Sequence, residues 1–268
     1  MNILLIDHYA GSPQYGMEYR PYYLAREWIR RGHRVIIIAA SFSHVRIKQP
    51  IVNRNISEEL IDDIQYIWIK TPSYKGNSVR RVWNILTFVG KLTALSKKLS
   101  KEFKPDVVVA SSTYPLDIYP AYLISRFAKA KIIFEVHDLW PLSPIELGKM
   151  PKWHPFIIMM QIAEDFAYKK ADRVISILPK AIDYMVSRGL VPEKFLHIPN
   201  GIDIDEWESF NALLPPQHQD TIERLKQERK FLICYAGSHG VANALDYLIE
   251  SASHLKDLPV TLILVGQG

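Results

Sequence analysis

The stretch KIIFEVHDLWP, residues 131 to 141, changes character halfway along. Its first four residues, a lysine followed by three apolar residues, are typical of a buried β-strand. Directly behind that run stand Glu135, His137 and Asp138, followed by a tryptophan and a proline. Ionisable side chains are rarely buried in a core, so their place directly behind a core strand points to a site at the end of that strand.

Short β-branched runs recur along the chain and alternate with helical patterns. The expected strands are residues 3–7, 35–39, 64–69, 107–110, 132–136, 174–177 and 195–198, and the expected helices between them include 22–31, 119–128 and 156–171. Nearly continuous apolar strands separated by helices predict an α/β fold, a parallel sheet with helices on both faces. Ligands of such sheets bind at the carboxyl ends of the strands, where the strand order reverses. The segment behind residue 134 therefore lies where this fold class binds its ligand.

The composition changes after Gly201. The following residues are polar and contain Pro215-Pro216 and a charged helical stretch at 221–229. The earlier pattern then restarts, with a strand at 231–236, a glycine-rich turn at 237–240, a helix at 244–255 and a strand at 260–265. We therefore expect a first domain at 1–205, a linker at 206–230 and, at 231–268, the beginning of a second, truncated α/β domain.

The bulk composition sets limits on the class of protein. The chain has 268 residues, is 48% hydrophobic and has one cysteine, Cys234, which excludes an internal disulfide and fits a reducing compartment. The start MNILLID lacks the basic region of a signal peptide, and no apolar run is long enough to span a membrane. Lys and Arg (33) outnumber Asp and Glu (28), which favours an anionic ligand, a nucleic acid or an anionic membrane surface as partner.

Five stretches, in order along the chain, together resemble the retaining glycosyltransferases of family 4. They are GMEYRPYYLA (16–25) with RGHRV (31–35), the strand that ends at His137, ADRVIS (171–176), IPNGID (198–203) and YAG (235–237). HDLWP is similar to members that build bacterial surface polysaccharides. The resemblance covers nearly the whole chain and implies the GT-B arrangement, a Rossmann-like parallel sheet followed here by the start of a second Rossmann-like domain.

This resemblance implies the function. A sugar would pass from a nucleotide-sugar donor, with retention, to a lipid-linked or polysaccharide acceptor in bacterial capsule, O-antigen or exopolysaccharide synthesis. The leaving phosphate helps to deprotonate the acceptor in the mechanism proposed for the family, so no cofactor and no metal are expected. We expect a cytoplasmic protein, peripheral on the inner face of the membrane. Nucleic acid is not an expected partner, because no reading helix or aromatic platform accompanies the basic residues.

The residues behind the first and fifth strands are the expected catalytic and acceptor site. Position alone leaves His137 open between a structural role and a ligand contact, and the resemblance favours contact with the transferred sugar. Asp138 is equally consistent with capping the next helix or turn and with acting on the acceptor. The long loop at 8–20 is expected to form the acceptor-side lip of the cleft. Its candidate acceptor-binding residues are Tyr15, Gly16, Glu18 and Arg20.

Two loops depart from the family pattern. The first loop usually has two glycines, but Tyr15 stands at the first of these positions and Gly16 at the second. Gly16 is expected to serve a turn of positive φ and to let backbone amides approach a phosphate. The second domain's opening loop normally carries an Arg and a Lys for the donor diphosphate, and here it has neither. The candidate donor-binding residues are Gly237, Ser238, His239, Gly240 and Asn243, with His239 or Asn243 in place of the cations. The missing cations favour one alternative, a degenerate, non-catalytic nucleotide-binding or scaffold relative.

Residues 64–101 contain no Asp or Glu, but they include Lys70, Lys75, Arg80, Arg81, Lys91, Lys97, Lys98 and Lys101. Apolar residues from Val82 to Phe103 recur at helical spacing, which predicts a helix with one side in the core. Trp83 and Phe88 fall beside the basic residues. A helix with aromatic and basic residues on its outer side is typical of a helix that lies on anionic lipid, so an anionic membrane surface is an expected partner.

Overall fold

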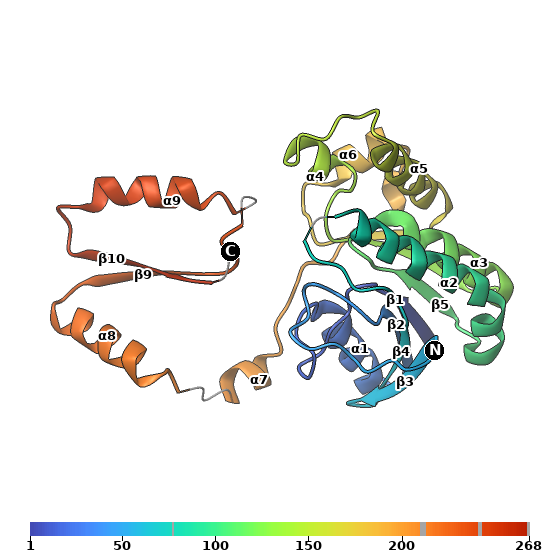
Figure 1. The fold of residues 1–268 in the computed structure, drawn as a ribbon, viewed down its shortest axis with the longest axis horizontal. Helices are drawn as coiled ribbons and strands as arrows, with labels where there is room; N and C mark the ends of the chain where they lie inside the picture. The colour runs from blue at the N-terminus through green and yellow to red at the C-terminus, as the bar shows by residue number, and fades with distance from the viewer. Residues whose placement is uncertain (77, 210–212, 241–242, 267–268) are drawn as a thin grey trace. The chain divides into compact units, whose positions relative to one another are not determined.

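The computed structural model describes residues 1–76, 78–209, 213–240 and 243–266. The chain divides into two compact units, Met1–Ile202 and Asp203–Gly268, which are described separately (Figure 1). Residues 210–212 of the predicted linker, Val241 and Ala242 of the predicted donor loop, Asn77 of the basic stretch, and residues 267–268 lie outside the described residues.

Unit 1 is built on an eight-stranded sheet with the order β3-β4-β2-β1-β5-β6-β7-β8. Its strands are β1 (Asn2–Ile6), β2 (Arg34–Ala40), β3 (Ile56–Ile61), β4 (Ile64–Ile69), β5 (Val107–Ala110), β6 (Lys131–Val136), β7 (Arg173–Ser176) and β8 (Phe195–His197). Every neighbouring pair is parallel except β3 and β4. The strand order reverses between β1 and β5, which makes their carboxyl ends the topological switch point. The predicted α/β fold class is confirmed.

The sequence prediction missed β3, which pairs antiparallel with β4 at the edge of the sheet. Its sequence ISEELI carries two glutamates, so it lacks the continuous apolar character of the central strands. Asp62 and Asp63 form a two-residue turn between β3 and β4, and both have positive φ (48° and 65°). Asp tolerates this conformation, which two-residue hairpin turns require, so this Asp-Asp pair was the available signal for the hairpin.

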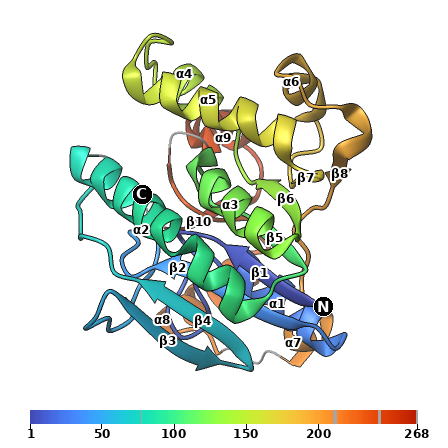
Figure 2. The same cartoon turned by 90° about the vertical axis from the view of Figure 1, so that its right-hand side faces the viewer.

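Helices cover both faces of the sheet (Figure 2). The helices of unit 1 are α1 (Arg20–Arg30), α2 (Val79–Phe103), α3 (Ile118–Ala128), α4 (Leu142–Glu146), α5 (Pro155–Lys170) and α6 (Ile182–Ser187), with 3-10 turns at Pro115–Asp117 and Pro192–Lys194. One core cluster joins the sheet to α2, α3 and α5 through side chains such as Phe88, Ala121 and Met160. A second cluster joins the other face to α1 through Tyr22 and Ala25.

The core-facing side of α2 differs from the predicted stripe. Phe88 was expected on the outer side but is fully buried, whereas Leu86 of the predicted stripe is 39% exposed. The buried side of α2 is formed by Asn84, Ile85, Phe88, Leu92, Ser96, Leu99, Ser100 and Phe103. Asn84 and Ser96 enter the core because each donates a hydrogen bond there, Asn84 to the Thr71 hydroxyl and Ser96 to the Leu92 carbonyl. Trp83 is 62% exposed, as predicted.

Unit 2 contains α7 (Ile204–Ser209), α8 (Pro216–Gln227), β9 (Phe231–Ala236), α9 (Leu245–Ala252) and β10 (Val260–Val265), with a 3-10 turn at Ser253–Leu255. β9 and β10 pair in parallel, and α9 connects them, so the predicted β-α-β unit is present. None of the described residues from Asp203 onward is buried. Among the described residues of both units, no helix is long and apolar enough to cross a membrane.

Candidate active site

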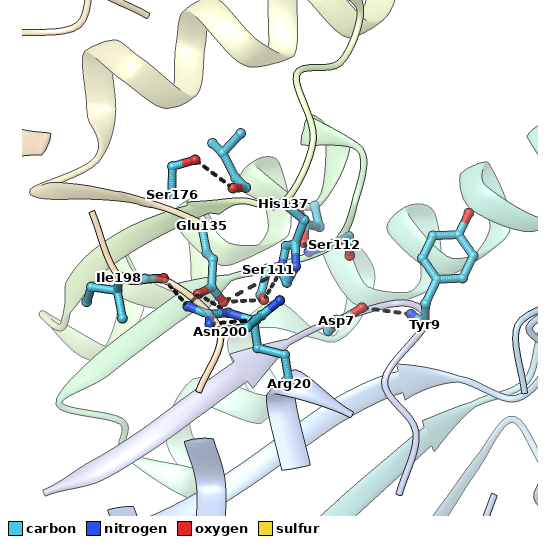
Figure 3. A network of polar contacts seen from close by, with 12 residues as sticks. Asp7, Tyr9, Arg20, Ser111, Ser112, Glu135, His137, Ser176, Ile198 and Asn200 are labelled. Atoms are coloured by element: carbon cyan, nitrogen blue, oxygen red, sulfur yellow. Dashed lines mark hydrogen bonds and ion pairs between the residues drawn. The ribbon is translucent and has the colours of Figure 1, made fainter. Parts of the chain in front are cut away.

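Polar side chains gather at the topological switch point of unit 1. Asp7 and His8 follow β1, Ser111 and Ser112 follow β5, and His137 follows β6. Hydrogen bonds join the ends of β1 and β5, since the His8 amide donates to the Ser112 hydroxyl (3.0 Å) and the Ser111 amide donates to the Ile6 carbonyl (2.8 Å). The sheet topology therefore brings the predicted residue His137 together with groups from two other strands (Figure 3).

His137 is held by the Ser111 hydroxyl. Its Nε2 lies 2.9 Å from Ser111 Oγ and 3.7 Å from Glu135 Oε2, and 12% of its side chain is exposed. The same hydroxyl donates to Glu135 Oε2 at 2.6 Å. A hydroxyl has one proton to donate, so Ser111 must accept its other hydrogen bond, from Nε2–H of His137.

This geometry fixes the tautomer of a neutral imidazole. A neutral His137 carries its proton on Nε2, which leaves the lone pair on Nδ1. Within the part of the chain that the structure describes, Nδ1 of His137 has no hydrogen-bond partner. An imidazole in this state accepts a hydrogen bond from a hydroxyl group, the type of group that a sugar supplies.

Arg20 fixes the other side of Glu135. Its Nε and Nη2 donate to Glu135 Oε1 at 3.0 and 2.8 Å, and both side chains are almost fully buried. The remaining N–H groups of Arg20 donate to the carbonyls of Ile198 and Pro199 and to Oδ1 of Asn200. All five N–H donors of the guanidinium are thus used within the protein. Arg20 ties the start of α1 to the end of β6 and to the IPN segment, and its contact with an acceptor stays a prediction.

A second polar group lies behind β1 and β5. His8 Nδ1 is 2.6 Å from the Tyr114 hydroxyl, and the Ser112 amide donates to Asp117 Oδ2 at 2.9 Å. Burial lowers the pKa of His8 well below its usual range, with the Arg46 charge as the next cause. Burial raises the pKa of Asp117 to about 7. It also raises the pKa of Asp7 well above its usual value, and the Glu18 charge adds to that shift. These groups favour their neutral forms, so they add polarity to the site without adding full charges.

The loop between β1 and α1 is fixed by its own backbone. Gly16 has φ +94°, as predicted, and its amide donates to the Ser12 carbonyl at 2.7 Å. A Cβ at Gly16 would lie 3.0 Å from the Ile47 amide nitrogen, so the close approach there is to the protein's own backbone. Glu18 closes the loop, because its amide donates to the Tyr9 carbonyl (3.2 Å) and its carbonyl accepts from the Gly11 amide (2.7 Å).

Two candidate acceptor-binding residues have partners inside unit 1. The Tyr15 hydroxyl donates to the carboxylate of Glu59 on β3, and its ring packs against Trp68. Tyr15 is only 6% exposed. Asp138 is exposed and accepts a hydrogen bond from the Ser143 hydroxyl (2.5 Å), which links it to the first turn of α4. This bond joins two side chains and does not cap α4, whose first turn has no side-chain cap, so both alternatives for Asp138 stay open and acceptor binding by both residues stays a prediction.

The candidate donor loop lies between β9 and α9 in unit 2. The Ser238 carbonyl accepts from the Tyr235 hydroxyl (2.8 Å) and from the Asn243 amide (2.7 Å), and the Ser238 hydroxyl accepts from the Gly240 amide (3.3 Å). Gly237, Ser238, His239 and Asn243 are exposed, and the His239 ring lies beside the ring of Tyr235. These side chains are accessible to a ligand, and donor binding by the loop stays a prediction.

A metal site is not evident in the described ranges, which contain no group of three or more His, Cys, Asp or Glu side chains placed to hold an ion. That catalysis needs no metal and no other cofactor stays a prediction.

The sequence prediction missed Ser111, Ser112 and the Asp7-His8 pair. Each directly follows a buried apolar strand, as His137 does, so the reasoning that found His137 applies equally to the ends of β1 and β5. The role of Glu135 was left open, because its partners Arg20 and Ser111 lie 115 and 24 positions away in the sequence.

The sequence profile of Glycosyltransferase Family 4 matches residues 15–206. The chain therefore belongs to Glycosyltransferase Family 4. It is 21% identical over 171 residues to WcaI of Escherichia coli (strain K12), by its description a colanic acid biosynthesis glycosyl transferase. That match covers 63% of this chain and 41% of WcaI. The chain thus spans well under half the length of this relative.

Solved structures share the fold. The structure of Anabaena Alr3699/HepE in complex with UDP and glucose superposes with a TM-score of 0.60 at 16% identity, over 100% of this chain and 61% of that one. A glycosyltransferase from Rickettsia africae ESF-5 gives a TM-score of 0.59 at 17% identity, over 98% of this chain and 60% of that one.

Proposed function

We propose that this chain is the acceptor-side part of a glycosyltransferase that moves a sugar from a nucleotide-sugar donor to a growing cell-surface glycan. The observation that carries the proposal is the His137 imidazole, fixed through Ser111 and the buried Glu135–Arg20 pair with Nδ1 left to accept a hydrogen bond. Family membership and the complex of the similar HepE with UDP and glucose support this assignment.

The proposed reaction needs little general acid–base catalysis from the protein. Nδ1 of His137 accepts a hydrogen bond from a hydroxyl of the transferred sugar and orients the anomeric carbon toward the acceptor. The β9–α9 loop stabilises the negative charge that develops on the leaving diphosphate through its backbone amides, with His239 and Asn243 beside them. The acceptor proton passes to the leaving phosphate, and the configuration of the sugar is retained.

The acceptor is a lipid-linked or polysaccharide chain of a bacterial surface glycan, such as a capsule, an O-antigen or an exopolysaccharide. The description of WcaI, which names colanic acid biosynthesis, supports this class of product. A lipid-linked acceptor is presented at the membrane, so the protein works as a peripheral protein on the cytoplasmic face of an anionic membrane.

A non-catalytic nucleotide-binding relative is the second candidate, because the described residues of the β9–α9 loop include neither Arg nor Lys. The two candidates separate in one experiment. The protein expressed from its complete reading frame is titrated calorimetrically with a panel of nucleotide sugars, beginning with UDP-sugars, and then assayed for transfer to membrane extracts. Nucleotide-sugar binding followed by transfer supports the enzyme. Binding with neither transfer nor hydrolysis of the donor supports the non-catalytic relative, and the absence of binding contradicts both candidates.

A further inference from the structure

One outer surface of unit 1 combines exposed apolar side chains with cations. It consists of the loop between α4 and α5 and the first half of α5, and we call it the α5 surface; its members are Leu147, Lys149, Lys152, Trp153, Ile158 and Ile162. Leu147 is 62%, Trp153 76% and Ile162 58% exposed. Ile158 and Ile162 are four residues apart, so they lie on the same side of α5. Several large apolar groups exposed together indicate a binding surface.

A hollow continues this surface toward α3. It is open, has a volume of about 370 Å³, and is lined by Tyr119, Pro155, Ile158, Met159 and Ile162. Four of these side chains are wholly apolar, so the hollow offers no strong polar group to a water-soluble ligand. Its lining instead matches hydrocarbon, the material of a lipid chain.

The charges around the surface are positive. Between Glu146 and Glu164 the sequence contains no acidic residue, and Lys149 and Lys152 flank Trp153 with both side chains exposed. Glu146, at the end of α4, is the acid nearest in sequence. A tryptophan, aliphatic side chains and lysines without intervening acids form the pattern of a segment that lies in the headgroup region of an anionic bilayer.

The basic face of α2 is less suited to this contact than its sequence indicated. Phe88 is buried, and Arg81 and Lys91 engage the Tyr9 hydroxyl and the Lys70 carbonyl respectively. Trp83 remains exposed, but Lys97 and Lys98 lie about 21 Å farther along the helix axis. Arg80 is exposed near Trp83, but the other cations of α2 are engaged within the protein or lie far from this ring, whereas Lys149 and Lys152 are exposed and flank the apolar groups of the α5 surface in the sequence.

We infer that the α5 surface docks on an anionic bilayer. Trp153 and Leu147 enter the headgroup region, Ile158 and Ile162 face the acyl chains, and Lys149 and Lys152 contact anionic headgroups. The purpose of this contact rests on the proposed function, since a membrane-linked acceptor would be reached there. The contact itself requires neither donor nor acceptor.

Vesicle sedimentation of the chain tests the inference. The parent should bind vesicles of equal phosphatidylcholine and phosphatidylglycerol, bind pure phosphatidylcholine weakly, and dissociate as salt rises. The double variant Leu147→Ser/Trp153→Ser should lose about tenfold or more of this partitioning, because apolar insertion supplies much of the affinity. The matched control Trp83→Ser/Leu86→Ser, on exposed positions of α2, should stay within about twofold of the parent. Lys149→Gln/Lys152→Gln should weaken binding and flatten its salt dependence.

Three results overturn the inference: no parental binding to the anionic vesicles, equal binding to both kinds of vesicle, or a loss confined to the α2 control. Circular dichroism verifies that each variant is folded. We expect all of them to fold, because the substituted side chains are exposed. Titration with nucleotide sugars separates this inference from the proposed function. Vesicle binding without nucleotide-sugar binding contradicts the proposed sugar transfer and leaves the docking intact. Nucleotide-sugar binding without vesicle binding contradicts the docking and the peripheral membrane location, and leaves the sugar transfer intact.

Discussion

Two strand ends of this molecule carry polar groups behind an apolar parallel strand, and they are held in different ways. At the end of β6, Glu135 is bonded to Ser111 and Arg20, which are 24 and 115 positions away in the sequence. Behind β9, all the bonds of Ser238 come from residues at most five positions away. The first site is fixed by side chains from distant parts of the chain, whereas the second is held by bonds within its own loop and by one backbone bond from the Gly237 amide to the Val265 carbonyl. Substitutions in the buried Arg20–Glu135 pair that holds the first site should therefore lower the free energy of unfolding, and those in the second site should lower it little.

The largest effect is expected at the buried ion pair. Glu135→Gln leaves the Arg20 guanidinium buried without a counter-charge, which should lower the free energy of unfolding of unit 1 by about 3–5 kcal/mol. Urea denaturation followed by circular dichroism measures the loss. The exposed pair between Arg224 and Glu228 on unit 2 is the control, and Glu228→Gln should cost no more than about 0.5 kcal/mol.

A double variant sharpens this test. Adding Arg20→Gln to Glu135→Gln removes the unpaired charge and should recover part of the lost stability. Equal losses of unfolding free energy for the buried and the exposed pair would mean that the Arg20–Glu135 pair holds unit 1 no more firmly than a surface ion pair does.

The next effect concerns catalysis. His137→Ala should lower kcat by about a hundredfold or more in the protein from the complete reading frame, because it removes a fixed polar contact to the reacting sugar. The free energy of unfolding should change little, since the side chain is partly exposed and makes one hydrogen bond. Steady-state kinetics with a radiolabelled donor measures the change, and His218→Ala, at an exposed site on α8, should leave it unaltered.

Ser111 is a positioning residue in this account. Ser111→Ala should lower kcat by roughly tenfold with little change in the donor KM, because His137 loses the group that sets its tautomer. A kcat for His137→Ala within a few-fold of the parent would assign His137 a structural role instead.

The strand ends show how far the sequence leads. The bounds of β4, β5, β9 and β10 follow from their apolar runs, and the position of His137 follows from parallel topology. The buried side of α2 does not follow from the sequence pattern. Asn84 and Ser96 are buried because they have hydrogen-bond partners, which hydrophobic periodicity does not reveal. The bond between Arg20 and Glu135 likewise depends on how α1 packs beside β6. Local pattern thus locates the site, and long-range packing decides which groups hold it.

A buried acid on α5 makes the stability of unit 1 depend on pH. Glu164 on α5 accepts hydrogen bonds from Tyr168 and Tyr184, and burial raises its pKa to about 7. The folded chain therefore keeps this proton up to about pH 7, whereas an unfolded chain releases it near its ordinary pKa of about 4.3. The contribution of Glu164 to stability is full below pH 4.3 and declines by roughly 3–4 kcal/mol as pH rises through 7.

The difference in unfolding free energy between the parent and Glu164→Gln isolates this decline. Measured by urea denaturation from pH 4 to pH 8, the difference should fall with pH and level off above about 7. The same measurement for Glu223→Gln, on the exposed surface of α8, should give no trend. A difference for Glu164→Gln that is constant with pH would contradict the raised pKa.

The smallest effect is expected in the loop behind β9. Asn243 donates to the Ser238 carbonyl, which also accepts from the Tyr235 hydroxyl, and both groups are exposed to water. An exposed hydrogen bond exchanges readily with water, so Asn243→Ala should change the free energy of unfolding by less than about 1 kcal/mol. We also expect it to weaken nucleotide-sugar binding only about threefold, because the backbone amides that face the diphosphate remain and the second bond to Ser238 still shapes the loop. Tyr235→Phe removes that second bond and is the matched control, with a similarly small effect expected by calorimetric titration. A tenfold or larger loss for Asn243→Ala alone would mean that its amide contacts the donor directly, and the loop behind β9 would then be a site built from side chains, as the end of β6 is.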